Sequence, residues 1–387
     1  MRRYFCDALM ATSQTLRQRI LIPILNALRM ILVPMGQFVL AKLVSNDSFE
    51  LWGQVVGVMI YIQLISIATA WGNKDFVLRE ASLMPANLPT IWGNFTSTRS
   101  PILLLGLVLL FMFLPLGQIL PILVWVMALF VIQSMESLVL FHEKIRRFAI
   151  MEVIVSFLFI TTAIIIRGSL NTSTDIFWLF ALTNLARAIF YILNFTTVLL
   201  RANYKIDTAL FVQALPFFLL GLSGMLFSKI DLYIAERLLS KTHLGKYQLF
   251  ITAFIQVQAL AGLLLMPLAK NIYRLNAAQV VKLSFKYLRL GALINAISGI
   301  LIYLILENLY SLHFGTSLYF LGALFSVGIF SSLPIIHYLY GRKQEKRVLQ
   351  INILGFILNL VMSILFVYIW DVLGLILSTA ISQLVVT

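Results

Sequence analysis

The chain has 387 residues, of which 61% are hydrophobic and 11% are charged, and its mean hydropathy is +0.96. This composition excludes a soluble globular domain and indicates a polytopic membrane protein. The formal net charge of +14 would also suit nucleic-acid binding. Most Lys and Arg residues, however, lie in the termini and in alternate loops, so we interpret the charge as a topology signal and expect no nucleic-acid partner.

The apolar runs predict membrane-spanning helices. A spanning helix needs about 20 apolar residues, and the chain divides into about twelve such segments. Barrel strands would alternate apolar and polar residues, so helices are favoured. We therefore predict an all-α polytopic membrane protein with two six-helix lobes, residues 1–203 and residues 204–387. The basic side places both termini in the cytoplasm, with the chain in a bacterial inner membrane.

An internal repeat relates the two predicted lobes. Ala41–Gly53 reads AKLVSNDSFELWG, and Glu236–Gln248 reads ERLLSKTHLGKYQ. Aligned without a shift, the two segments place Trp52 opposite Tyr247. Repeats are common in transporter folds whose substrate sites lie between the repeats.

The first predicted span, Ile20–Leu43, carries a polar stripe. It contains Asn26, Arg29 and Gln37, and at 100° per residue all three lie within a narrow sector of the helix. Arg29 lies about 14 Å from the cytoplasmic end at 1.5 Å per residue. A structural ion pair with a carboxylate is the alternative, but this depth favours a polar cavity.

Two carboxylates and a long polar segment mark the next four spans, Leu51–Ala70, Pro101–Leu116, Ile119–Phe141 and Ala149–Ile166. The segment between Ala70 and Arg99 predicts an interfacial helix and a loop. Glu152 is interpreted as the partner of a nearby Arg. For Glu136 both a structural role and a role in ion coupling stay open.

The sixth span, Ile176–Leu200, places several polar side chains on one helical face: Thr183, Asn184, Arg187, Tyr191 and Asn194. Arg187 reaches the same estimated depth as Arg29. Two guanidinium groups at one level repel each other unless an anion joins them, so this pair is the sharpest functional signal in the sequence.

The loop Arg201–Asp207 joins the halves, and the seventh span, about Phe211–Leu238, carries Lys229 and Asp231. A lipid-facing charge at mid-bilayer costs at least ~2.5 to 3.5 kcal/mol, so both side chains are expected to face a water-accessible lumen. Two residues apart on a helix, they should not pair directly. Asp231 is a candidate carrier of a coupling proton.

The remaining spans are predicted at Tyr247–Pro267, Leu290–Leu306, Leu318–Tyr340, the segment that holds Asn352, Asn359 and Ser363, and Val372–Val386. The loop Ser240–Lys246 is predicted to be periplasmic. The amides and hydroxyls of these spans are interpreted as helix-packing groups.

Motif searches exclude several activities. The chain contains no P-loop, and its four histidines have no metal-ligand spacing. Its predicted extracytoplasmic loops are too short for a catalytic domain. We therefore expect a protein that is not an enzyme and has no cofactor or metal, with an ion or proton gradient as an open energy source.

Four phrases resemble polysaccharide flippases of the multidrug/oligosaccharidyl-lipid/polysaccharide exporter superfamily, specifically the O-antigen and lipid-linked oligosaccharide translocases. They are LVSNDSFELWGQVV, WGNKDFVLRE, SKIDLYIAERLLSKTHLGKYQLF and INILGFILNLVMSILFVYIWDVLGLILSTAIS. The resemblance covers essentially the whole chain. It implies alternating access that moves a polyprenyl-diphosphate-linked oligosaccharide from the cytoplasmic to the periplasmic leaflet, for O-antigen (lipopolysaccharide) or capsule biosynthesis.

The resemblance also directs the choice of site residues. A diphosphate calls for cations in a wet cavity, and Arg supplies bidentate donors. The expected substrate-binding residues are Arg29, Arg187, Lys229, Asn26, Gln37, Asn184 and Tyr191, with Asp231 and Glu136 in coupling. Membrane lipids and the polysaccharide polymerase machinery are the expected partners. The alternatives are a cation-coupled drug exporter of the same superfamily and a membrane-embedded polysaccharide polymerase or ligase.

Overall fold

The computed structural model describes residues 25, 27–45, 49–265, 272 and 274–386, and this part of the chain is all-helical. Its eleven longest apolar segments could each cross a membrane, beginning with Ala27–Val44. The helices are α2 (Glu50–Ala70), α3 (Asn73–Leu83), α4 (Leu88–Phe111), α5 (Leu116–Phe141), α6 (Ile145–Ile165), α7 (Ser173–Asn194), α8 (Thr196–Arg201), α9 (Thr208–Leu238), α10 (Lys241–Leu265), α12 (Ala277–Leu304), α13 (Thr316–Gly341) and α14 (Glu345–Val386).

The last segment accounts for the difference between eleven segments and the twelve predicted spans. Helix α14 has 42 residues and is interrupted at Asp371, whose φ of 53° and ψ of −129° are not helical. On either side of this turn the hydroxyls of Ser363 and Ser378 lie 2.6 Å apart. The chain therefore folds back at Asp371, and α14 contains both of the last two predicted spans.

Several helices begin earlier than the apolar runs suggest. Helix α4 begins at Leu88 rather than Pro101, α12 at Ala277 rather than Leu290, and α10 at Lys241, within the predicted loop Ser240–Lys246. Hydropathy marks only the part of a helix that lies in hydrocarbon, whereas the helix itself continues into the polar boundary. The predicted loop between Ala70 and Arg99 is thus largely helical.

The earlier start of α4 brings Arg99 into the protein interior, where it is fully buried. Its guanidinium donates to the carbonyl oxygens of Thr69 at 2.8 Å and Ala70 at 3.2 Å, and to the hydroxyl of Ser134 at 2.9 Å. The last carbonyls of a helix have no intrahelical donor. Arg99 therefore closes the end of α2, a role that its position at the edge of a polar segment did not reveal.

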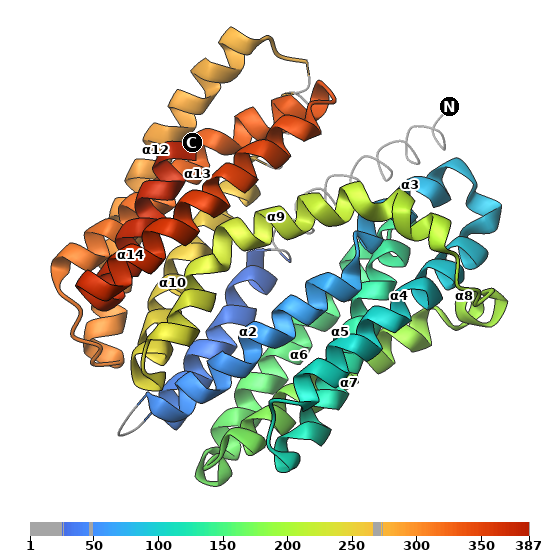
Figure 1. Cartoon of the computed structure of the whole chain (residues 1–387), viewed down its shortest axis with the longest axis horizontal. Helices are drawn as coiled ribbons and strands as arrows, with labels where there is room; N and C mark the ends of the chain where they lie inside the picture. Colours follow the sequence, from blue (N-terminus) through green and yellow to red (C-terminus); the bar gives the residue numbers. More distant parts are fainter. Residues whose placement is uncertain (1–24, 26, 46–48, 266–271, 273, 387) are drawn as a thin grey trace, which may run out of the picture.

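The helices form two lobes that meet along α2 and α10 (Figure 1). At this contact a Cβ added to Gly53 would overlap the backbone carbonyl of Lys241, and one added to Gly245 would lie 2.7 Å from the carbonyl oxygen of Phe49. The indole of Trp52 also donates to Gln248 at 3.0 Å. Small residues thus let the two lobes touch through their backbones, as in other tightly packed membrane helices.

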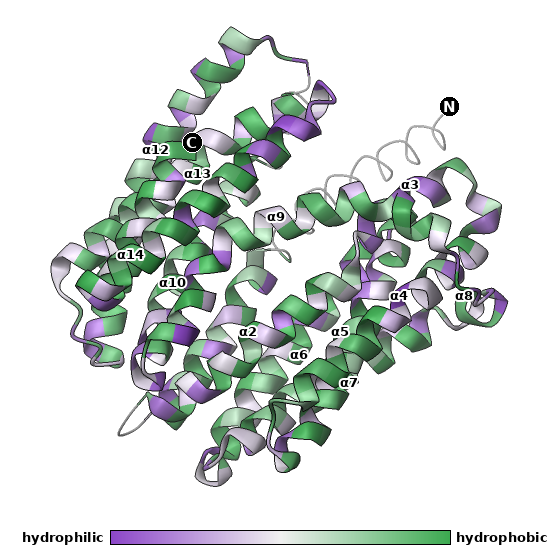
Figure 2. Ribbon diagram, viewed as in Figure 1, coloured by the Kyte–Doolittle hydropathy of each residue, from purple (hydrophilic) through white to green (hydrophobic). Residues whose placement is uncertain are grey.

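The lobes repeat one helical plan. Helix α5 and helix α13 each have 26 residues, and each is followed by a short turn and a further spanning helix. Hydrophobic residues dominate the middle of the helices, while hydrophilic residues gather at α3, at α8 and at the turn between α13 and α14 (Figure 2). This is the pattern expected of a multi-pass membrane protein.

The first helix of each half reaches toward the opposite lobe. In Ala27–Val44 the carbonyl of Phe38 accepts a hydrogen bond from Tyr310 at 2.7 Å. In α9 the rings of Phe211 and Phe218 stack on Trp71, each with centroids 3.9 Å apart. Packing therefore exchanges these two helices between lobes that the chain order separates.

Candidate functional site

Two polar cavities lie side by side where the lobes meet. The first, about 260 Å³, is surrounded by Ala27–Val44, α2, α5, α6 and α7 of the N-terminal half. The second, about 210 Å³, lies between Ala27–Val44, α2, α9 and α10. Val33, Gln37 and Gln63 line both, so the two cavities form one region that faces both halves of the chain.

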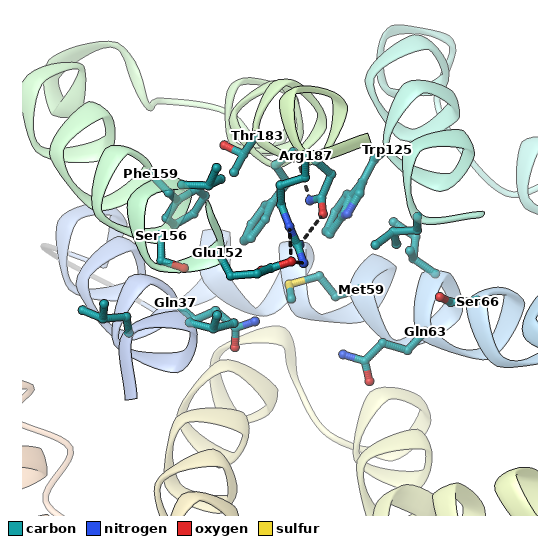
Figure 3. A pocket seen from close by; sticks show the side chains of 17 residues that line it. Gln37, Met59, Gln63, Ser66, Trp125, Glu152, Ser156, Phe159, Thr183 and Arg187 are labelled. Carbon is teal, nitrogen blue, oxygen red and sulfur yellow. Dashed lines mark hydrogen bonds and ion pairs between the residues drawn. The ribbon is translucent and has the colours of Figure 1, made fainter. Parts of the chain in front are cut away.

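An ion pair dominates the first cavity. Figure 3 shows Arg187 from α7 pointing toward Glu152 from α6, and its guanidinium contacts one carboxylate oxygen through Nε at 3.1 Å and through Nη2 at 2.5 Å. Asn184 accepts from Nη1 at 2.9 Å. The Glu152 side chain is 5% exposed and that of Arg187 is 24% exposed. Arg187 is therefore the partner that an entering molecule can reach.

Further charges surround this pair and define an N-lobe charge cluster, Arg29, Lys74, Glu136, Glu152 and Arg187. Glu136 lies within electrostatic range of the other four groups. Tyr191 is buried beside the cluster, with its ring 4.5 Å from that of Phe148. Three bases face two carboxylates, so the cluster retains a surplus of positive charge.

The second cavity presents one cation held by a neutral group. Lys229 from α9 donates to the side-chain carbonyl of Gln63 from α2 at 2.6 Å. The contact joins the two halves of the chain directly. Lys229 and Asp231 do not form a printed ion pair within the described residues, in agreement with their two-residue spacing. The ammonium of Lys229 thus meets an uncharged amide rather than a carboxylate.

Asp231 is buried at the rear of the second cavity. It accepts a hydrogen bond from the hydroxyl of Tyr247 and interacts with Thr379. Its other oxygen, Oδ1, lacks a donor in hydrogen-bonding geometry among the described residues. A buried carboxylate with one oxygen left open is suited to take up a proton or a cation.

A polar network made of amide and hydroxyl groups lies next to Asp231. The amide oxygen of Asn359 accepts from Ser363 at 3.0 Å, from Thr379 at 3.4 Å and from Ser378 at 3.5 Å. All four side chains are fully buried. The network joins the two arms of α14, so the amides and hydroxyls that the sequence assigned to packing do pack helices together.

The structure brings together most of the residues expected at the site. Gln37, Asn184 and Arg187 line the first cavity, whereas Gln37, Lys229 and Asp231 line the second. Arg29, Glu136 and Tyr191 lie beside the first cavity without lining it: Arg29 is exposed, and Tyr191 is buried in the lobe. Asn26 lies outside the described residues.

The sequence did not single out several polar residues that line the cavities. They include Gln63, Ser66, Ser156, Gln248 and Gln256. Gln63 and Ser66 are three apart on α2 and therefore share a helical face, which was the available signal. Isolated amides in membrane helices usually serve packing, so only their convergence in space marks them as cavity residues.

Comparisons with known proteins place the fold. No family model matches the chain, and no curated protein matches it in sequence. The solved structures include an inward-facing multidrug resistance MATE family transporter of the MOP superfamily, 14% identical, with a TM-score of 0.63 over 93% of this chain and 95% of that chain. The chain has a MATE-like fold. An outward-facing MATE transporter is also similar, again 14% identical, with a TM-score of 0.55 over 95% of this chain and 92% of that chain.

The two neighbours differ in conformation, and this chain scores higher with the inward-facing structure than with the outward-facing one. The backbone contact between Gly53 and Lys241 closes the lobes at one end, where the connection between α9 and α10 lies. In Figure 1 the lobes spread apart toward the opposite end, where α3 lies. The described geometry is therefore that of a MATE-like fold closed at one end.

Proposed function

We propose that the chain is a flippase that moves a polyprenyl-diphosphate-linked oligosaccharide from the cytoplasmic to the periplasmic leaflet, for O-antigen or capsule biosynthesis. The supporting observation is that reachable cations from both lobes face one region: Arg187 in the first cavity and Lys229 in the second. Rearrangement of two lobes around a central site is the expected motion of a fold built from repeats.

The cations suit a diphosphate in two complementary ways. Arg187 presents a planar fork that can engage two phosphate oxygens, and Lys229 adds a point charge from the other lobe. In the absence of an anion, Glu152 and Gln63 occupy these donors. An entering diphosphate would compete for the exposed side of Arg187 and for Lys229, and it would thereby join the lobes through one ligand.

Asp231 is proposed as the coupling group. It lines the same cavity as Lys229, and its open Oδ1 provides a place for a proton or a cation. Neutralising this carboxylate would change the charge that Lys229 experiences, so occupancy of Asp231 would alter the attraction of the cavity for an anion. Glu136 is a second candidate, because it lies within electrostatic range of Arg187.

A cation-coupled drug exporter is the second candidate function. Glu152 lines the first cavity together with Trp125, Phe159 and Phe180, and a carboxylate among aromatic rings suits an organic cation. This reading requires Glu152 to exchange Arg187 for the drug. The surplus of bases in the N-lobe charge cluster opposes it.

Reconstitution distinguishes the two functions. Purified protein in liposomes is supplied either with a fluorescent glycan on a polyprenyl diphosphate or with ethidium, and movement across the bilayer is followed by quenching from outside. We expect the lipid-linked glycan to move and Arg187→Gln to slow it by about ten-fold or more, since a charge-assisted hydrogen bond contributes ~1.5 to 3 kcal/mol. Movement of ethidium with no movement of the glycan would replace this proposal with the exporter.

A further inference from the structure

A third pocket lies on the side of the molecule, separate from the two central cavities. It has a volume of about 550 Å³ and is enclosed by α2, α4 and the start of α5 and α7 on one side and by the ends of α9 and α10 on the other. None of its lining residues lines either central cavity. We call it the lateral pocket. Its volume falls in the usual range for small-molecule sites, roughly 300 to 1,000 Å³.

The walls of the lateral pocket are apolar and open toward the lipid-facing surface. Leu109 is 50% exposed and Phe113 is 83% exposed, whereas Leu110 is buried. Along α2 the lining extends from Gln54 to Ile65, a distance of about 16 Å at 1.5 Å per residue. The pocket is therefore long enough for a stretch of hydrocarbon chain, and its mouth is reached from the bilayer.

One end of the lateral pocket carries charges. Glu236 accepts from the hydroxyl of Tyr61 at 2.8 Å and from Lys241 at 3.2 Å, and Arg237 approaches it at 3.6 Å. The Glu236 side chain is 13% exposed, while those of Lys241 and Arg237 are 41% and 76% exposed. Two accessible cations thus share one carboxylate that is already engaged, which leaves positive charge available to an anion.

The charged end lies at the boundary of the membrane. Arg237 lies in the last turn of α9, Lys241 is the first residue of α10, and Pro115 and Ser173 stand at the starts of α5 and α7. All are helix ends at which the chain turns. The apolar length of the pocket runs from these ends along α2 into the span, so its polarity follows that of a membrane lipid, with the headgroup outside and the chain inside.

We propose that the lateral pocket binds an anionic lipid, with one hydrocarbon chain along α2 and α4 and a phosphate headgroup beside Arg237 and Lys241. The site is built from both halves of the chain, because α2 and α4 form one wall and the ends of α9 and α10 form the other. It does not depend on what the central cavities transport. The shared chemistry suits either a bulk phospholipid or a polyprenyl phosphate.

Gly57 offers a way to fill the pocket with little disturbance. A Cβ there would lie 3.4 Å from the Nζ of Lys241 and 3.7 Å from Glu236, both of them ends of flexible side chains. Gly57→Leu should therefore occupy the space beside the charged end. Gly221 supplies the matched control, because it is exposed on α9 and a Cβ there would meet nothing within 4 Å.

The test uses the full chain in phosphatidylcholine nanodiscs that contain phosphatidylglycerol with a photoreactive diazirine in one chain. After irradiation, labelled residues are mapped by mass spectrometry. We expect labels on the pocket wall near Leu109 and Ile65, with labelling lowered several-fold in Gly57→Leu and unchanged in Gly221→Leu. A second filling variant, Leu109→Trp at the mouth, should lower labelling in the same way. Equal labelling of the pocket wall in all four proteins would overturn the proposal.

A second arm tests the headgroup and its source. Arg237→Gln should reduce the preference for diazirine-labelled phosphatidylglycerol over diazirine-labelled phosphatidylcholine toward a ratio of one. Unlabelled polyprenyl phosphate and unlabelled phosphatidylglycerol are then added as competitors, and the more effective competitor identifies the source of the lipid. Failure of both competitors to reduce labelling, or an unchanged preference in Arg237→Gln, would contradict an anionic lipid site. The liposome assay with ethidium and glycan reports on the central cavities, so the two proposals fail separately.

Discussion

The two lobes treat buried charge differently. In the N-terminal lobe Glu152 is neutralised by a charged partner, Arg187, whereas in the C-terminal lobe the groups next to Asp231 are the hydroxyls of Tyr247 and Thr379. Removing one member of a buried ion pair leaves the other charge exposed to a poor solvent. A carboxylate held by neutral donors can instead gain or lose one positive charge without leaving an unpaired partner. The first arrangement suits a fixed binding element, and the second suits a switch.

The largest effect is expected from breaking the ion pair. Arg187→Ala would leave the buried carboxylate of Glu152 without its guanidinium, which typically costs about 3 to 5 kcal/mol of folding stability. Arg187→Ala combined with Glu152→Gln removes both charges and should recover most of the thermal stability in detergent. Transport of the lipid-linked glycan should stay lost in both variants, because the proposed phosphate ligand is absent.

Arg146→Ala is the matched control for this pair, because Arg146 is exposed near the start of α6, the helix that carries Glu152. It should change neither stability nor transport. If the double variant regained transport as well as stability, Arg187 would have only the role of neutralising Glu152.

A smaller effect on stability, with a specific effect on coupling, is expected in the C-terminal lobe. Asp231→Asn keeps an acceptor for Tyr247 and removes a buried charge, so thermal stability should be unchanged or higher. Glycan movement in liposomes should lose its response to an imposed proton or sodium gradient. Asp75→Asn, an exposed acid in the first turn of α3, should keep that response. An intact gradient response in Asp231→Asn would leave Asp231 with a structural role only.

The smallest effect is expected at the contact between the lobes. Lys229→Gln replaces a charge-assisted hydrogen bond to Gln63 with a neutral one, and such bonds differ by roughly 1 kcal/mol. Because the contact joins α9 to α2, its loss should shift the balance between conformations by several-fold rather than unfold the protein. Spin labels placed on the two lobes would report this shift as a change in the distance distribution. The exposed Lys346→Gln on α14 should leave the distribution as in the wild type, and an identical distribution in Lys229→Gln would exclude the contact as a conformational lock.

Hydropathy predicts the helices because the cost of unpaired backbone groups in hydrocarbon is the same for every sequence. The predicted seventh span, about Phe211–Leu238, closely matches α9, and the expectation that Glu152 pairs with an Arg is met by Arg187. The starts of α4 and α12 were wrong because their first turns are polar. Those turns are helical through local hydrogen bonds and capping, as at Asn276, which caps α12 together with Gln279.

The candidate site was only partly predictable for a related reason. Lys229, Asp231 and Arg187 stand out because a charge within an apolar run is costly wherever it lies. Gln63 and Asn359 do not stand out, because an amide is common in membrane helices, and its meaning depends on what it meets. Gln63 meets Lys229 from the other half of the chain, 166 positions away, and no local pattern encodes that encounter.

The sequence by itself determined that the chain spans a membrane many times, where its buried charges lie and that its halves repeat, because these follow from the transfer energies of individual residues and from spacing along a helix. Only the tertiary structure decided which charges face one another. It also decided that Ala27–Val44 and α9 reach toward opposite lobes, and that Gly53 and Gly245 let the lobes touch. These outcomes depend on shape and close packing between helices distant in the chain, where the contact of each residue is set by all its neighbours at once.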